Sequence, residues 1–288
     1  MTSAEEDHML VEELIANGFV RIEAALDPEF CEHVVQTTFE RERWPAVPGS
    51  WPVGPVHLPA AETFPLADVA PRAADALDEL VGGIGATRFS DLPDNLIVNF
   101  PDSSHAPQTP VQRAADPEGW HKDGDWFRHF LDSPEQGLLG IVLWRDVTEG
   151  QGPTCIAVDS IGPMARLLAA HPEGLDPVEL KAPVAAILAG CHDIQAVTGR
   201  QGTIIFAHPF LLHAASVNTS ATPRVISNTS VMLRTPMCFN RHSGEHTAVE
   251  RSVLHALGAD HVDFRPTGER LKVTSERQRR WKTARDRT

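Results

Sequence analysis

The chain has 288 residues, of which 42% are hydrophobic and 22% are charged, proportions typical of a folded globular protein. Its formal net charge of −14 argues against a nucleic-acid-binding surface over the whole chain. No apolar run reaches the roughly 18 residues that a membrane span needs, and the acidic start lacks the pattern of a secretory signal. We therefore expect a cytoplasmic protein with no nucleic-acid or membrane partner.

Helical patterns dominate the first part of the chain. Residues 5–17 read as a helix that ends at Gly18, and FVRIEAAL then reads as a strand. A second helix is predicted to begin at Asp27-Pro28, where an N-cap residue precedes a proline in the first turn. The proline-rich segment 44–60 is predicted to be a loop, and ADVAPRAADALDELVGG a further helix that ends in glycines. These patterns predict a helical N-terminal flank over about residues 1–90.

The pattern changes near residue 91, where short apolar and β-branched runs begin. They are NLIVNF, LLGIVLWRDV, PTCIAV, GTIIFA, LLHAASV and RVISNTSVMLR. We predict a strand-rich core over about 91–240 with a helical insertion at about 161–190, then a C-terminal helix and basic tail over about 241–288. The whole is predicted to be one domain, residues 1–288, mainly β with flanking helices, on a β-sandwich or jelly-roll core.

One short stretch, GWHKDGDW, suggests a metal site. On a β-strand, side chains two positions apart leave the same face, so His121 and Asp123 would point together. With a second histidine they would form the two-histidine, one-carboxylate set of non-haem Fe(II) enzymes. Taken alone, H-x-D is a weak signal, and a hydrogen-bonded surface pair is the alternative.

Two histidines further along the chain are candidates for the third ligand. His208 and His213 both lie in GTIIFAHPFLLHAASV, and His213 lies in an apolar run where an unpaired polar group would be costly to bury. Arg224 follows eleven residues after His213, and a guanidinium can hold a dicarboxylate through a two-pronged pair. The alternatives are a core histidine bonded to a backbone carbonyl and a structural salt bridge of the arginine.

Together these residues resemble the phytanoyl-CoA dioxygenase-like branch of Fe(II)/2-oxoglutarate-dependent oxygenases. The resemblance spans about residues 18–235 and includes GFVRIEAALDPEFCEHV and TEGQGPTCI. It implies a double-stranded β-helix (jelly-roll or cupin-like) core, with His121, Asp123 and His213 as the catalytic ligands of Fe(II). It also implies that Arg224 binds the 5-carboxylate of 2-oxoglutarate, and it favours His213 over His208.

The activity that the resemblance implies is oxidation, most simply hydroxylation, of a small-molecule substrate such as one in secondary metabolism. The reaction would consume 2-oxoglutarate and O₂ and release succinate and CO₂. The chain departs from the family at Ala215, where a hydroxyl residue is usual, and at Ala157-Val158-Asp159-Ser160, which replaces Pro-Gly-Ser-His. Asn99 and Thr154 are candidates for further contacts with 2-oxoglutarate. The rival functions are a cupin-like metalloenzyme that does not use 2-oxoglutarate and a non-catalytic binding protein.

Candidate substrate contacts are Trp126, Phe127, Trp144 and His105. For the three aromatic residues the alternative is core packing, and for His105 it is a place in solvent. The arginine-rich tail that follows Glu276 is either a solvated terminal segment or a docking patch.

Overall fold

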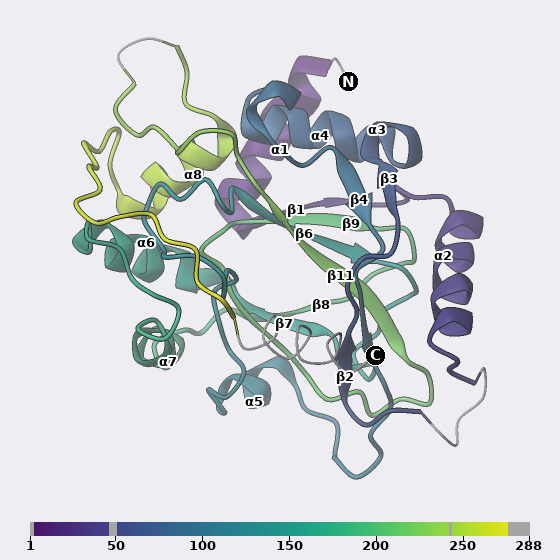
Figure 1. Cartoon of the computed structure of the whole chain (residues 1–288). Coiled ribbons are helices and arrows are strands. Elements are labelled where there is room, and N and C mark those ends of the chain that lie inside the picture. Colours follow the sequence, from purple (N-terminus) through teal and green to yellow (C-terminus); the bar gives the residue numbers. More distant parts are fainter. Residues whose placement is uncertain (1–2, 46–50, 242–243, 276–288) are drawn as a thin grey trace.

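The computed structural model describes residues 3–45, 51–241 and 244–275, and its centre is formed by β-sheets surrounded by helices (Figure 1). The larger sheet has six strands in the order β1-β9-β6-β11-β5-β2, and every pair in it is antiparallel. A smaller antiparallel sheet has the order β10-β7-β8, and β3 and β4 form a separate pair. The bounds are β1 Phe19–Ile22, β2 Pro55–His57, β3 Thr63–Pro65, β4 Asp91–Pro93, β5 Leu96–Asn99, β6 Leu138–Leu143, β7 Thr154–Ala157, β8 Ile194–Val197, β9 Ile204–Ala207, β10 Leu212–Ala215 and β11 Arg224–Val231.

An apolar cluster joins the inner faces of the two main sheets. The larger sheet contributes alternate residues such as Ile141 and Ile205, and the smaller sheet contributes Ile156 and Val197. Because side chains alternate across a strand, the neighbours Cys155 and Ala157 of β7 face the other way and belong to the second, larger cluster. The two sheets therefore lie face to face, and residues of even number on β7 point between them.

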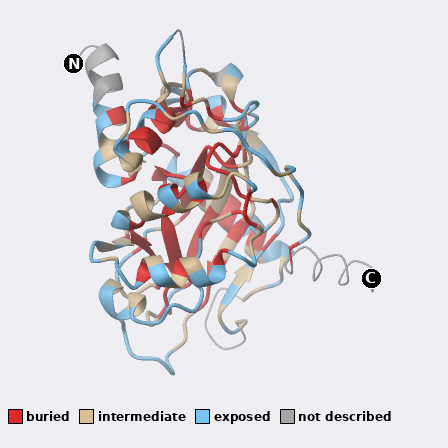
Figure 2. Cartoon of the chain, turned by 90° about the vertical axis from the view of Figure 1, so that its left-hand side faces the viewer, coloured by how far each residue is buried: buried red, intermediate tan, exposed pale blue. Residues whose placement is uncertain are grey.

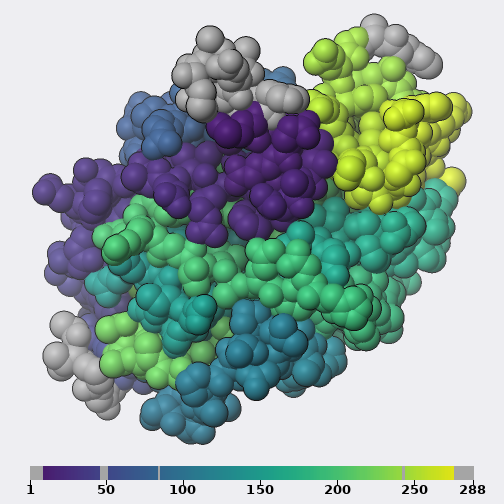
Figure 3. Space-filling view, turned by 180° about the vertical axis from the view of Figure 1, so that it is seen from behind, coloured from purple at the N-terminus to yellow at the C-terminus, as the bar shows by residue number. Residues whose placement is uncertain are grey.

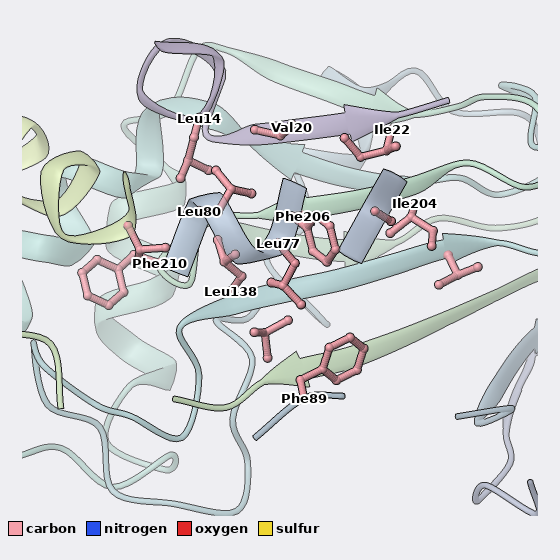
Figure 4. Close-up of a cluster of buried hydrophobic side chains, with 14 of the residues drawn as sticks. Leu14, Val20, Ile22, Leu77, Leu80, Phe89, Leu138, Ile204, Phe206 and Phe210 are labelled. Atoms are coloured by element: carbon pink, nitrogen blue, oxygen red, sulfur yellow. The ribbon is translucent and has the colours of Figure 1, made fainter. Parts of the chain in front are cut away.

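The outer faces are covered by helices, whose buried sides meet the sheets and whose other sides are exposed (Figure 2). Leu77 and Leu80 of α4 lie beside Leu138 and Phe206 of the larger sheet (Figure 4). The bounds are α1 Ser3–Asn17, α2 Pro28–Arg41, α3 Leu66–Val69, α4 Pro71–Val81, α5 Pro110–Ala114, α6 Ile161–Ala170, α7 Lys181–Leu188 and α8 Ala248–Leu257, with 3-10 turns at Ile84–Ala86 and Val158–Ser160.

The two ends of the described chain meet on one face of the molecule. Helix α1 contacts α8, and Figure 3 shows the purple N-terminal residues beside the yellow C-terminal ones.

Among the described residues, no helix has the length and apolar character needed to cross a membrane.

The apolar runs predicted as strands correspond to β5, β6, β7, β9, β10 and β11, and the predicted helix at Asp27 is α2, whose first amides donate to Asp27 Oδ1. The predicted helical insertion at 161–190 contains α6 and α7. Two differences are informative: the predicted loop at 44–60 contains β2, and β8, which follows the insertion, was not predicted. The predicted basic tail, 276–288, lies outside the described residues.

Candidate metal centre

The two histidines of the predicted metal set lie on neighbouring chain segments. His121 forms an isolated antiparallel bridge with His213 of β10, and each backbone N–H donates to the carbonyl of the other residue at 3.0 Å. The segment around His121 thus extends the smaller sheet beyond β10. Residues paired in this way carry their side chains on one face, and the two imidazole ring centres are 4.3 Å apart.

Asp123 completes the cluster, although not on a strand as the sequence pattern predicts. The chain bends at Asp123, after the single bridge at His121. This bend directs the carboxylate back, with Oδ1 3.5 Å from His121 Nε2 and Oδ2 3.8 Å from His213 Nε2. One ligand atom from each residue lies within 4.8 Å of the others, so the three side chains can hold one metal ion. Adjacent corners of an octahedron with bonds of about 2.1 Å are about 3 Å apart. The three ligand atoms would therefore have to move closer together when a metal ion binds.

Backbone carbonyls orient both imidazoles. His121 Nδ1 lies 2.8 Å from the Gly119 carbonyl, and His213 Nδ1 lies 3.2 Å from the Leu211 carbonyl. A carbonyl only accepts, so Nδ1 carries the proton and each Nε2 presents its lone pair to the centre of the cluster. His213 Nε2 is buried and has no hydrogen-bond partner among the described residues. Burial, with the positive charge that His121 can carry, lowers the pKa of His213 to about 4, so its imidazole is neutral as a metal ligand requires.

A buried lysine lies on the other side of the H-x-D segment. Lys122 is 6% exposed, and its Nζ lies 3.0 Å from His129 Nδ1 and 3.3 Å from both Gln136 Oε1 and the Asp123 carbonyl. Loss of hydration lowers the pKa of Lys122 to about 7. The lysine thus holds the backbone of Asp123 against the interior. From the sequence, strand alternation predicts only that the Lys122 side chain points away from that of His121.

Arg224 lies between the two sheets, at the first residue of β11. It is 1% exposed, and its Nη1 donates to Thr154 Oγ1 of the smaller sheet at 3.3 Å. Thr154 is paired with Ala215, two residues beyond His213 on the same face of β10. Asn99 is paired with Arg224, but its amide donates to the Ser216 carbonyl at 2.9 Å. The structure therefore brings Arg224 and Thr154 to the His213 side of the small sheet.

Within the described part of the chain, the buried guanidinium of Arg224 has no carboxylate partner. Its Nε has no hydrogen-bond partner within the described chain, and no ion pair of the described residues includes it. Burial lowers the pKa of Arg224 to about 10, which still leaves the side chain charged at neutral pH. A buried cation without a counter-charge is expensive, so this position is suited to an anionic ligand.

The other predicted contacts lie in different surroundings. Trp126 and the buried Phe127 meet edge to face, with ring centres 4.8 Å apart, on the loop that follows Asp123. Trp144 lies on the outer face of the large sheet, under α2, and donates to Ser227 Oγ at 3.0 Å. His105 is in an exposed loop, 3.1 Å from Asp102. His208, the rival third ligand, is buried outside the three-residue cluster, and its Nδ1 accepts from the Phe210 amide.

The sequence matches no protein-family model, and no curated protein matches it. Among solved structures it is similar to SnoK, a non-heme α-ketoglutarate-dependent carbocyclase from nogalamycin biosynthesis, at 18% identity over 78% of this chain and 83% of that chain, with a TM-score of 0.46. EctD from S. alaskensis with 2-oxoglutarate and 5-hydroxyectoine gives 14% identity, 80% and 76% coverage and a TM-score of 0.47. AviO1 from Streptomyces viridochromogenes Tue57 is 16% identical over 80% of this chain and 96% of that chain, with a TM-score of 0.46. Likenesses this distant do not determine an activity, which must be inferred from the site itself.

Proposed function

We propose that this protein is an Fe(II)- and 2-oxoglutarate-dependent oxygenase that hydroxylates a small-molecule substrate. The observation that carries the proposal is the pairing of a two-histidine, one-carboxylate cluster with a buried arginine that has no carboxylate partner among the described residues. Either feature alone is compatible with a purely structural role. Together they provide ligands for a metal ion and, where Arg224 of β11 reaches Thr154 of the facing β10–β7 strand pair, a partner for the far end of a dicarboxylate.

The spacing along β10 supports 2-oxoglutarate as the occupant. Thr154, which accepts from Arg224, is paired with Ala215, one two-residue step beyond His213. Such a step measures about 6.8 Å along a strand, a length that a five-carbon dicarboxylate can span. Arg224 would bind the 5-carboxylate and Thr154 would contribute a hydroxyl. The Thr154 hydroxyl also offers a substitute for the one that Ala215 lacks, because the two side chains share a face.

The donor set fits Fe(II). Nitrogen from His121 and His213 and oxygen from Asp123 would occupy three corners, which leaves the others for co-substrates. The Nε2 of buried His213, which has no hydrogen-bond partner among the described residues, is the observation that favours an ion here over a structural histidine. Fe(II), when bound, supplies the activation of O₂ that is coupled to loss of CO₂ from 2-oxoglutarate. The protein's own residues hold the ligands in place, pair with the co-substrate carboxylate and exclude water.

We also propose that the fold is a double-stranded β-helix. Two facing antiparallel sheets with the cluster at the edge of the smaller one are what we expect of a double-stranded β-helix. The arrangement also supports the sequence resemblance to phytanoyl-CoA dioxygenase-like enzymes.

Anaerobic binding of Fe(II) and 2-oxoglutarate tests the proposal. We expect a visible charge-transfer band that needs both components, and succinate release that increases with the correct substrate. Arg224→Met should keep Fe(II) binding and weaken 2-oxoglutarate binding by more than about tenfold, because each charge-assisted hydrogen bond contributes about 1.5–3 kcal/mol. Arg200→Met, at an exposed side chain paired with Asp146, is the matched control for loss of one charge.

The rival functions give different results. Native protein that binds Fe(II) but shows no 2-oxoglutarate band would be a cupin-like metalloenzyme of another kind. Binding of both with no succinate across a broad substrate panel would indicate a non-catalytic binding protein. Failure to bind any divalent ion would end the proposal.

A further inference from the structure

The two segments that carry the histidines are joined by a single backbone bridge. In an antiparallel pair the next hydrogen-bonded rung after His121 and His213 would join Gly119 to Ala215. That rung is not formed. Gly119 adopts a left-handed φ of 77°, and its carbonyl turns to the His121 imidazole instead. The Ala215 carbonyl, on the same edge of β10 as that of His213, therefore needs another donor.

Arg113 of α5 supplies that donor. Its Nε donates to the Ala215 carbonyl at 2.9 Å, while its Nη1 and Nη2 donate to the carbonyls of Asp116 and Glu118 at 2.8 and 2.6 Å. The planar guanidinium thus spans the end of β10 and the turn that leads into His121. A planar fork with several N–H donors in fixed directions suits this role, and a lysine ammonium does not reproduce it.

Arg113 is itself held by Trp120, the residue that precedes His121. The guanidinium carbon lies 5.8 Å from the Trp120 ring centre, and Trp120 Nε1 donates to the Arg113 carbonyl at 3.3 Å. Trp120 is 6% exposed and packs in the large apolar cluster. Trp120 therefore contacts both the side chain and the backbone of Arg113. The position of the guanidinium does not depend on solvent-exposed charges.

We propose that Arg113 is a positioning residue for the metal centre, which replaces the missing rung and so fixes His121 relative to His213. The inference rests on the proposed metal site. Without this fork, the Gly119 turn would lose its attachment to β10, and the Gly119 carbonyl would no longer hold His121 Nδ1. Residues that orient metal ligands from behind typically change metal affinity by about 10- to 100-fold.

Two measurements on the full chain test this role, and neither depends on turnover. The first is Co(II) affinity by titration calorimetry. Arg113→Met should weaken it by about 10- to 100-fold, and guanidinium at non-denaturing concentration, but not methylammonium at equal ionic strength, should restore part of the loss. Arg113→Lys keeps the charge and the stem beside Trp120 but lacks the fork, so it should also bind Co(II) weakly while remaining folded. Arg200→Met should match native protein.

The second measurement is the imidazole tautomer of His121 by nitrogen NMR in metal-free protein. Native protein should show a protonated Nδ1, and Arg113→Met should show a mixture of tautomers. Native Co(II) affinity in a folded Arg113→Lys or Arg113→Met variant, an unchanged tautomer, or an equal loss in Arg200→Met would overturn the inference. A native protein whose tautomer is fixed by Arg113 but which binds no Co(II) would instead contradict the proposed function.

Discussion

Individual residues at this site are constrained by backbone geometry as much as by side-chain chemistry. Gly152 shows this most clearly, with φ at +67° and no room for a side chain. A Cβ there would lie 2.6 Å from Asn99 Nδ2 and 2.7 Å from the Ser216 carbonyl, which are hydrogen-bonded to each other beside Arg224. The glycine therefore lets three chain segments meet at the end of the sheets that carries the arginine.

Gly152→Ala should consequently lower the free energy of unfolding by roughly 2–4 kcal/mol, which combines the cost of a left-handed alanine with that of overpacking. Denaturant unfolding measures it. Gly150→Ala is the matched control, because Gly150 lies two residues earlier with no atom of the described residues within 4 Å of the added Cβ, and a change within about 0.5 kcal/mol is expected there. Equal losses of unfolding free energy in the two variants would show that the neighbours of Gly152 do not crowd an added Cβ.

At the scale of single elements, the apolar strands were predictable and the connections were not. The strands β6 and β9, within the runs LLGIVLWRDV and GTIIFA, are fully buried, so composition alone marks them. In contrast, β8 is only partly buried, and β2, β3 and β4 are three-residue strands that contain proline, which weakens every strand signal. The bend at Asp123 and the Arg113 fork left no signal either, because both depend on which segments tertiary folding brings together.

The short helix α5 places Arg113, and its N-terminus is closed by a capping box. Thr109 accepts from the Gln112 amide, and the Gln112 side chain accepts from the Thr109 amide. Five residues are too few for a helix to persist by propagation, so the cap is a main source of local order. α5 contacts β8 and β7 but has no buried residue, whereas α8, which carries the same device with Thr247 and Glu250, buries several residues and packs against α1, α4 and α6.

Thr109→Ala should therefore weaken Co(II) binding by about fivefold, the equivalent of a lost cap of about 1 kcal/mol, with little change in global stability. Thr247→Ala should do the reverse, lowering the free energy of unfolding by about 1 kcal/mol at constant Co(II) affinity. Calorimetry and chemical denaturation of both variants separate the two effects. If both variants lose only stability, α5 does not contribute to ligand placement.

At the scale of the whole molecule, distant parts of the chain converge on the metal centre. The described C-terminal segment pairs with the loop after Asp123, since Val273 N donates to the Trp126 carbonyl and Arg128 N to the Leu271 carbonyl. The ligands themselves come from segments about ninety residues apart in sequence. Motif spacing can nominate such residues as candidates, but only the packing of the sheets brings them to one place.

Global folding also buries several neutral histidines, which makes stability depend on pH. Burial lowers the pKa of His208 to about 3 and that of His129 well below its usual value, and Lys122 adds to both effects. Their pKa in the unfolded chain is about 6.5. Below that pH the unfolded state binds more protons than the folded state, so the free energy of unfolding falls as the pH decreases.

We expect metal-free protein to lose up to about 1.4 kcal/mol of stability per pH unit for each such histidine between pH 6 and pH 4.5. His208→Asn should reduce this slope by about one histidine's share, even if the variant is less stable at neutral pH. His255→Asn, at an exposed position of α8, is the matched control for removal of one histidine. Urea unfolding at several pH values measures the slope, and an unchanged slope in His208→Asn would mean that this imidazole takes up its proton without unfolding the chain.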